Sequence, residues 1–106
     1  MFVKIYQYHI KENKVDEYLS IQDKVSKIYC KYIDFHTMYF NSKNDDTKWL
    51  EITRYKDEEE YNKSIKIINE QEEIQDLFKG FQSLLLTDKS EISEEDFIER
   101  QEKRNF

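Results

Sequence analysis

The sequence contains no proline, a single glycine and a single cysteine among its 106 residues. So few chain-breaking residues favour long, regular elements joined by few sharp turns. One cysteine excludes a disulfide within the chain, so a reducing, cytoplasmic compartment is the expected location. No apolar run approaches the roughly 20 residues of a membrane span. The first residues also lack the basic start and apolar middle of a signal peptide. No membrane partner is therefore expected.

Positive charge is scarce relative to negative charge. The chain has 17 Lys and Arg against 23 Asp and Glu, and its formal net charge is −6 at pH 7. Neutralising phosphates requires clustered Lys and Arg, whereas these are scattered, so no nucleic-acid partner is expected. The two histidines lie apart from the single cysteine and from any carboxylate spacing typical of a metal site. Neither a metal nor another cofactor is expected.

Aromatic residues, by contrast, are abundant. They form 15% of the chain, with eight Tyr, seven Phe and one Trp. So many rings need an interior in which to pack, which argues against a disordered chain. A chain of this length forms one domain that buries roughly two thirds of its unfolded surface.

Residues 34–61 (DFHTMYFNSKNDDTKWLEITRYKDEEEY) predict a strand, a polar turn at 42–47, a second strand and a helix. A strand with one face in water should alternate apolar and polar residues. Here neither strand has a face made of polar residues alone. The first puts Phe35, Thr37 and Tyr39 on one face and His36, Met38 and Phe40 on the other, and the second puts Trp49 and Tyr55 opposite Leu50 and Ile52. Both faces of this hairpin must therefore be covered.

The remaining elements follow from periodicity and capping residues. Residues 2–10 predict another strand, again with apolar groups on both faces. Asn13 is expected to cap a helix that runs to about Tyr32. Asp57 with Glu60 resembles a capping box and starts a second helix, which should break near residues 70–73. Gly80 lies inside the part of this helix that follows the break. There it indicates either a close approach to another backbone or simply a glycine that the helix tolerates.

The order is strand, helix, strand, strand, helix and a weak final element, which is the ferredoxin-like α+β arrangement with an antiparallel sheet. The domain is expected to span residues 1–86. Residues 87–106 form a charged extension, in which Phe97 and Ile98 predict either a short strand or the edge of a docking helix. Because helices can cover only one face of such a sheet, the apolar second face predicts a homodimer.

Two segments carry a resemblance to a known superfamily. They are residues 49–61 (WLEITRYKDEEEY) and residues 73–85 (EIQDLFKGFQSLL). In these segments the chain resembles the dimeric α/β-barrel superfamily, in particular its antibiotic-biosynthesis-monooxygenase-like and NIPSNAP-like branches, over residues 1–86. The resemblance implies that two subunits join their sheets into a barrel and that ligands bind between sheet and helices.

The resemblance also implies two chemistries. Some members oxidise aromatic substrates without a bound cofactor, and others degrade haem. The haem-degrading branch has a Trp just before the second helix and a His on that helix. Here Tyr55 stands near the Trp position, and residues 58–85 contain no His. This departure disfavours haem chemistry.

Five residues are candidates for lining a pocket: His9, His36, Tyr39, Trp49 and Arg54. An imidazole can act as a base, tyrosines and a tryptophan can hold a planar substrate, and a guanidinium can bind a carboxylate. Each group also has a structural alternative. The histidines can simply pack or face solvent, and the rings, including Tyr6, Tyr8 and Tyr55, can form core or interface. Arg54 can pair with Glu51 or with an acid of a partner subunit.

Two functions remain open at this point, and no catalytic residue is assigned. One is a cofactor-free, monooxygenase-like enzyme acting on a small aromatic or polyketide-like compound, with tyrosines and His36 positioning the substrate. The other is a non-catalytic dimer that binds a small molecule or serves as an accessory protein. Cys30, near the end of the first helix, is expected to be a buried structural thiol rather than a reactive one.

Overall fold

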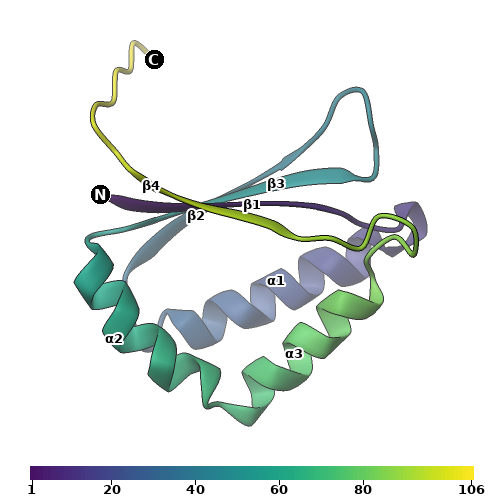
Figure 1. The fold of residues 1–106 in the computed structure, drawn as a ribbon, viewed down its shortest axis with the longest axis horizontal. Coiled ribbons are helices and arrows are strands. Elements are labelled where there is room, and N and C mark those ends of the chain that lie inside the picture. The colour runs from purple at the N-terminus through teal and green to yellow at the C-terminus, as the bar shows by residue number, and fades with distance from the viewer.

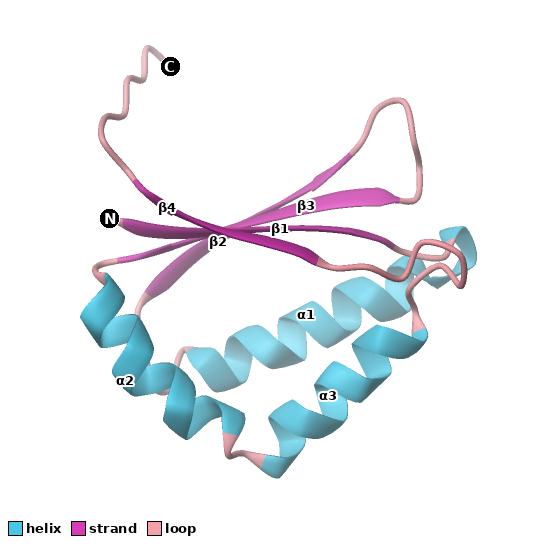
Figure 2. Ribbon diagram, in the orientation of Figure 1, coloured by secondary structure: helices cyan, strands magenta, loops and turns pink.

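The computed structural model describes all 106 residues, and its strands form where aromatic and β-branched residues concentrate. They are β1 (Phe2–His9), β2 (Phe35–Asn41), β3 (Lys48–Tyr55) and β4 (Ser93–Ile98). All neighbours pair antiparallel in the order β2-β3-β1-β4, so β1 and β3 are central. The charged C-terminal segment thus contributes an edge strand to the sheet. This α+β ferredoxin-like arrangement confirms the predicted fold class (Figure 2).

The helices all lie on one face of the sheet (Figure 1). A short 3-10 turn, η1 (Glu12–Lys14), leads into α1 (Val15–Tyr29). The second helical region is broken into α2 (Glu58–Asn69) and α3 (Glu72–Ser83), and the break lies within residues 70–73 as predicted. Figure 1 shows that α2 and α3 meet at an angle, so that together with α1 they surround the space below the sheet.

Local signals at two helix starts had different outcomes. The Asp57 side chain accepts a hydrogen bond from the backbone N–H of Glu60 at 2.7 Å, which confirms Asp57 as the cap of α2. Asn13, in contrast, lies within η1 and does not cap α1, whose N-cap is Lys14 without a side-chain hydrogen bond. The 3-10 turn displaces the helix start and removes Asn13 from the capping position.

The first helix is also shorter than predicted. It ends at Tyr29 rather than near Tyr32, because the backbone N–H groups of Lys31 and Tyr32 bond to carbonyls three residues back. Such tighter bonds close the last turn of a helix. Gly80 on α3 lies against α1: a Cβ there would stand 3.3 Å from Cδ1 of Ile21. The small residue thus permits a close approach of α3 to α1.

The interior contains two hydrophobic clusters at opposite ends of the sheet. One gathers Tyr8, Ile10, Tyr18, Trp49, Phe81, Leu84 and Leu85. The other gathers Phe2, Ile28, Ile33, Tyr55, Ile68 and Ile74. Each central strand contributes to both clusters, and the residues between these positions face the middle of the helix-covered side. This leaves space for a site between the two clusters.

The opposite face of the sheet carries no helix (Figure 1). Its side chains are those that alternate with the helix-facing ones, and about half of them are apolar. The apolar ones include Val3, Ile5, Met38, Phe40, Leu50, Ile52 and Phe97. Phe40 and Phe97 are 47% and 42% exposed. None of the helices has the length and apolar character needed to cross a membrane.

Candidate functional site

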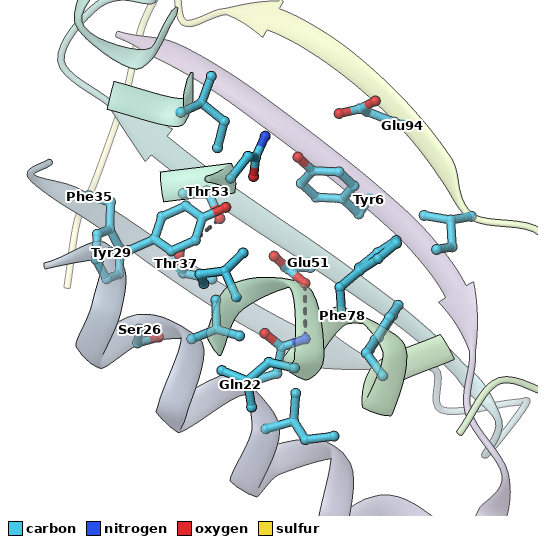
Figure 3. Close-up of a pocket in the computed structure, with 18 of the residues that line it drawn as sticks. Tyr6, Gln22, Ser26, Tyr29, Phe35, Thr37, Glu51, Thr53, Phe78 and Glu94 are labelled. Carbon is cyan, nitrogen blue, oxygen red and sulfur yellow. Dashed lines mark hydrogen bonds between the residues drawn. The ribbon is translucent and has the colours of Figure 1, made fainter. Parts of the chain in front are cut away.

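A cavity of about 550 Å³ lies between the sheet and the helices, in the gap between the two hydrophobic clusters (Figure 3). Its floor comes from the middle of β1, β2 and β3, and its walls come from α1, α2 and α3. The exposed residues of its lining are Asn69, Gln75, Phe78 and Glu94. Because these belong to α2, α3 and β4, the cavity opens to solvent between those elements. Its volume is typical of small-molecule sites.

Aromatic rings dominate the lining. Six tyrosines and three phenylalanines contribute: Tyr6, Tyr8, Tyr29, Tyr39, Tyr55, Tyr61, Phe35, Phe78 and Phe81. Burial raises the pKa of each of these tyrosines above its ordinary value. Their hydroxyls therefore stay neutral at physiological pH and act as hydrogen-bond donors or acceptors. The arrangement suits a planar, mostly apolar ligand with a few polar groups.

Glu51 is the one acidic residue on the floor of this cavity. It lies on the central strand β3, paired with Tyr6 of β1 and Tyr39 of β2. Its Oε1 accepts a hydrogen bond from the Tyr8 hydroxyl at 2.7 Å and a long one from Gln22 Nε2 at 3.5 Å. Figure 3 shows the Glu51–Gln22 contact crossing from the sheet to α1. A carboxyl group is thus held at the base of an aromatic chamber.

The partners of Glu51 extend this contact into a network. The hydroxyls of Tyr8 and Tyr18 lie 2.6 Å apart. Since the single hydroxyl proton of Tyr8 is donated to Glu51, Tyr18 donates to the Tyr8 oxygen. The Tyr39 hydroxyl donates to Oε1 of Gln22 at 3.2 Å. The chain Tyr18–Tyr8–Glu51 and the Tyr39–Gln22 pair together orient the carboxyl group from both sides.

The environment of Glu51 perturbs its acidity. Burial raises the pKa of the Glu51 carboxyl above its ordinary range, and the hydrogen bond from Tyr8 offsets part of that rise. No Lys, Arg or His lines the cavity. A carboxyl with a raised pKa in a cleft is the pattern expected of a general base or of a ligand-binding group.

The opposite end of the cavity approaches a buried ammonium group. Lys4 of β1 is 6% exposed, and its Nζ lies 2.7 Å from Asp96 Oδ1 and 3.1 Å from Glu94 Oε1. The same Nζ stands 5.0 Å from the centre of the Tyr61 ring and 6.0 Å from that of Tyr6. Lys4 is thus already paired, and it holds the edge strand β4 beside the cavity.

The structure places Tyr39 in the cavity lining and Trp49 next to it. Trp49 belongs to the adjacent hydrophobic cluster, with its ring 4.9 Å from that of Tyr18. It does not line the cavity, and its buried Nε1 has no hydrogen-bond partner. His9 lies at the end of β1, where its Nδ1 contacts the Thr47 hydroxyl at 2.9 Å, also away from the cavity.

His36 and Arg54 lie on the uncovered face of the sheet, opposite to the cavity. They are cross-strand partners, and strand alternation sends both side chains away from Thr37 and Thr53, which line the cavity. Arg54 does not pair with Glu51, as one alternative had it. Its Nε and Nη2 bond to the Glu99 carboxylate at 2.8 and 3.0 Å. The five candidates therefore do not converge on one site.

The expectation for Cys30 was wrong. This residue is exposed, and its Sγ donates to the backbone oxygen of Lys27 at 3.1 Å. It occupies the C-cap position of α1, one residue beyond the end of the helix. Because α1 ends at Tyr29, Cys30 lies beyond the amphipathic stripe of the helix, at an exposed position.

Sequence reasoning missed Glu51 as a site residue. A usable signal was present, because Glu51 has the same strand parity as Trp49 and Tyr55, whose side chains are buried. A carboxylate on that face must be hydrogen-bonded or functional, since a buried charge is otherwise costly. The two residues that bond to it, Tyr8 and Gln22, come from two other segments of the chain, and the sequence does not show that they meet.

Several solved structures have the same fold as this chain, and the similarity covers almost its whole length. An uncharacterised NIPSNAP domain protein from Burkholderia xenovorans is 16% identical with a TM-score of 0.74, covering 99% of this chain and 100% of that one. SnoaB, a cofactor-independent oxygenase from Streptomyces nogalater, is 10% identical with a TM-score of 0.72, covering 95% and 94%. An antibiotic biosynthesis monooxygenase is 15% identical with a TM-score of 0.70, covering 95% and 100%.

The chain has the fold of NIPSNAP and antibiotic-biosynthesis-monooxygenase proteins. The superfamily resemblance stated from the sequence is thereby confirmed at the level of fold. At identities of 10–16% the likeness extends to the fold alone. No protein-family model matches the sequence, and no curated protein sequence matches it. Function must therefore be argued from the cavity.

Proposed function

We propose that this protein binds a small, planar aromatic compound in the cavity and oxidises it with dioxygen, without a bound cofactor, using Glu51 as the general base. The observation that carries the proposal is the Glu51 carboxyl, held by Tyr8 at 2.7 Å on the floor of a chamber lined by nine aromatic rings. Burial raises the pKa of this carboxyl, which brings it closer to the range of an effective base.

The chemistry requires only a base and dioxygen. Glu51 removes a proton from an acidic CH₂ group of the aromatic compound and leaves a delocalised carbanion. The carbanion reduces dioxygen and forms a C–O bond, and protonation gives a hydroperoxide. Loss of water from the hydroperoxide yields a ketone. The overall change is CH₂ plus O₂ to C=O plus H₂O, so atoms and electrons balance without a metal or flavin.

Two features support an oxygenase of this kind. SnoaB, which shares the fold, is a cofactor-independent oxygenase. In addition, the tyrosines that surround Glu51 stay neutral because burial raises their pKa, so they can orient a planar substrate through ring contacts and hydroxyls.

Anthrone tests the proposal, because it is a planar three-ring compound with an acidic CH₂ whose oxidation product absorbs light differently. The protein should accelerate oxygen uptake by anthrone, and Glu51→Gln should lower the rate by about 100-fold or more. Glu12→Gln, the same charge change at an exposed position of η1, should leave the rate unchanged. A rate no faster than buffer, or a fully active Glu51→Gln variant, would contradict the oxygenase proposal. Anthrone binding without oxygen uptake would favour the alternative of a non-catalytic binding protein.

We also propose that the protein is a homodimer joined through the uncovered face of its sheet. Support comes from the apolar side chains that alternate along this face and from the exposure of Phe40 and Phe97, which a second copy would cover. Leu50→Glu, on the central strand β3 of this face, should lower the mass measured by sedimentation to that of one chain. Lys66→Glu, on the exposed side of α2, should leave the mass unchanged. A wild-type monomer at micromolar concentration would contradict the proposal.

A further inference from the structure

The charges around the cavity do not balance. Its lining includes two acidic residues, Glu51 and Glu94, and no Lys, Arg or His. Glu94 already has a cation, because Lys4 Nζ lies 3.1 Å from its carboxylate and also bonds to Asp96 at 2.7 Å. Glu51 has no cationic partner of its own. Its donors are the neutral hydroxyl of Tyr8 and the neutral amide of Gln22.

A buried carboxylate without a counter-ion is costly, so it either takes a proton or acquires a positive partner. Beside Glu51, the protein supplies two neutral hydrogen bonds and leaves the rest of the carboxyl group facing the cavity. A ligand that brings a positive charge would lower this cost. A ligand that brings a second negative charge would raise it, because like charges repel strongly in a low-dielectric site.

The aromatic rings that line the cavity also favour a positively charged ligand. The faces of Tyr and Phe rings attract cations, and quaternary ammonium groups in particular bind in cages of such rings. The chain already shows this chemistry at the edge of the cavity. Lys4 Nζ stands 5.0 Å from the Tyr61 ring, 5.7 Å from Phe2 and 6.0 Å from Tyr6, and both tyrosines line the cavity.

We propose that the cavity selects ligands that carry a positively charged nitrogen next to an aromatic ring, with the nitrogen beside Glu51, and that it rejects carboxylates and phosphates. The ligand class is therefore an arylalkylamine, which is protonated at physiological pH, or an aromatic quaternary ammonium compound. This inference rests on the proposed function only in assigning the ligand to this cavity. A cation beside Glu51 also keeps the carboxylate ionised, which is the form that accepts a proton.

Three probes of matched shape test the sign of the charge by titration calorimetry. They are (3-hydroxyphenyl)trimethylammonium, its neutral counterpart 3-tert-butylphenol, and the anion 3-hydroxybenzoate. The first two differ only in the replacement of a carbon by a charged nitrogen. We expect the cation to bind the wild-type protein about tenfold or more tightly than the neutral compound, and the anion to show no binding.

Paired variants show whether Glu51 causes the preference. Glu51→Gln keeps the size of the side chain and its hydrogen-bond acceptor but removes the charge, so the cation should lose its advantage while 3-tert-butylphenol binds as before. Glu12→Gln changes the net charge equally at an exposed position of η1, outside the cavity lining and the sheet, and should preserve the preference. Circular dichroism establishes that both variants fold; should Glu51→Gln not fold, the three probes on the wild-type protein still decide.

The outcomes separate this inference from the function on which it rests. Equal or tighter binding of 3-tert-butylphenol to the wild-type protein would overturn the charge selection and leave an aromatic ligand site in place. An equal loss of the preference in Glu12→Gln would also overturn it, because the effect would then come from the net charge of the protein. Failure of all three probes to bind would overturn both the inference and the proposed ligand site.

Discussion

Replacing Tyr8 by Phe removes one oxygen atom from the centre of the network that holds Glu51. Tyr8 is 2% exposed, its hydroxyl donates to Glu51 at 2.7 Å, and it accepts from Tyr18 at 2.6 Å. The ring remains, so its edge-to-face contact with Phe81 at 4.9 Å is kept. The change therefore measures the hydroxyl rather than the packing.

The expected loss of stability follows from the two contacts. A hydrogen bond to a charged group contributes about 1.5–3 kcal/mol, and leaving a buried hydroxyl without a partner costs about 1–3 kcal/mol. The first applies to Glu51, which keeps only the 3.5 Å contact with Gln22, and the second applies to Tyr18, which has no other side-chain partner. Because the contacts form one network, they do not simply add. We expect a total of about 2–4 kcal/mol.

Urea unfolding at pH 7 measures this loss. For a slope of about 1.5 kcal/mol/M, within the range of small proteins, the midpoint should fall by roughly 1.3–2.7 M at an unchanged slope. Tyr32→Phe provides the control, because Tyr32 is exposed and its hydroxyl makes no hydrogen bond. The control should stay within about 0.5 kcal/mol of the wild type. A Tyr8→Phe variant as stable as Tyr32→Phe would refute the network.

The effect should also depend on pH. The hydrogen bond from Tyr8 lowers the pKa of Glu51, so its removal raises that pKa further. At low pH the carboxyl is protonated in both proteins and the charged component of the bond is absent. The difference in stability should therefore shrink as pH falls through the pKa of Glu51. A difference in stability that stays constant from pH 7 to pH 4 would show that the loss does not come from the hydrogen bond to the Glu51 carboxylate.

Three further outcomes are expected. Burial raises the pKa of Glu51 in the folded state, so the folded protein keeps this proton to a higher pH than the unfolded chain does. The free energy of unfolding of the wild type should therefore fall relative to that of Glu51→Gln as pH rises from about 4.5. Parallel curves of stability against pH for the two proteins would contradict this. Lys4→Met removes the ammonium that binds two acids of β4, so amide exchange in Ser93–Ile98 should accelerate about tenfold while β2 is unaffected, as mass spectrometry can measure. Cys30 is exposed, so a thiol reagent should modify it fully in the native protein, and protection until unfolding would show that it is covered.

Much of the fold follows from neighbours along the chain. The alternation in residues 34–61 correctly separated the two faces of the hairpin, because successive side chains of a strand point in opposite directions. The polar turn at 42–47 and the Asp57 cap were also predicted, since turn and capping preferences depend on a few adjacent residues. Asn13 shows the limit of this reasoning, because a 3-10 turn displaced the helix start.

Which residues meet at the candidate site depends on how segments that are far apart in the sequence pair and pack. Strand alternation predicts that His36 and Tyr39 lie on opposite faces of β2. It does not say which face borders the helices, because that depends on the side on which α1, α2 and α3 pack. Arg54 could not be paired from the sequence, because Glu99 reaches it only after β4 has paired with β1.

The sequence by itself determined the element order, the two apolar faces of the sheet and the break in the second helical region. These are short-range consequences of side-chain period and of turn and cap chemistry. Only the tertiary structure decided that Glu51 faces a cavity, bonded to Tyr8 and Gln22 from two other elements. The physical reason is that an open space arises from how far apart the helices and sheet are held by two separate hydrophobic clusters. No local pattern of residues encodes that distance.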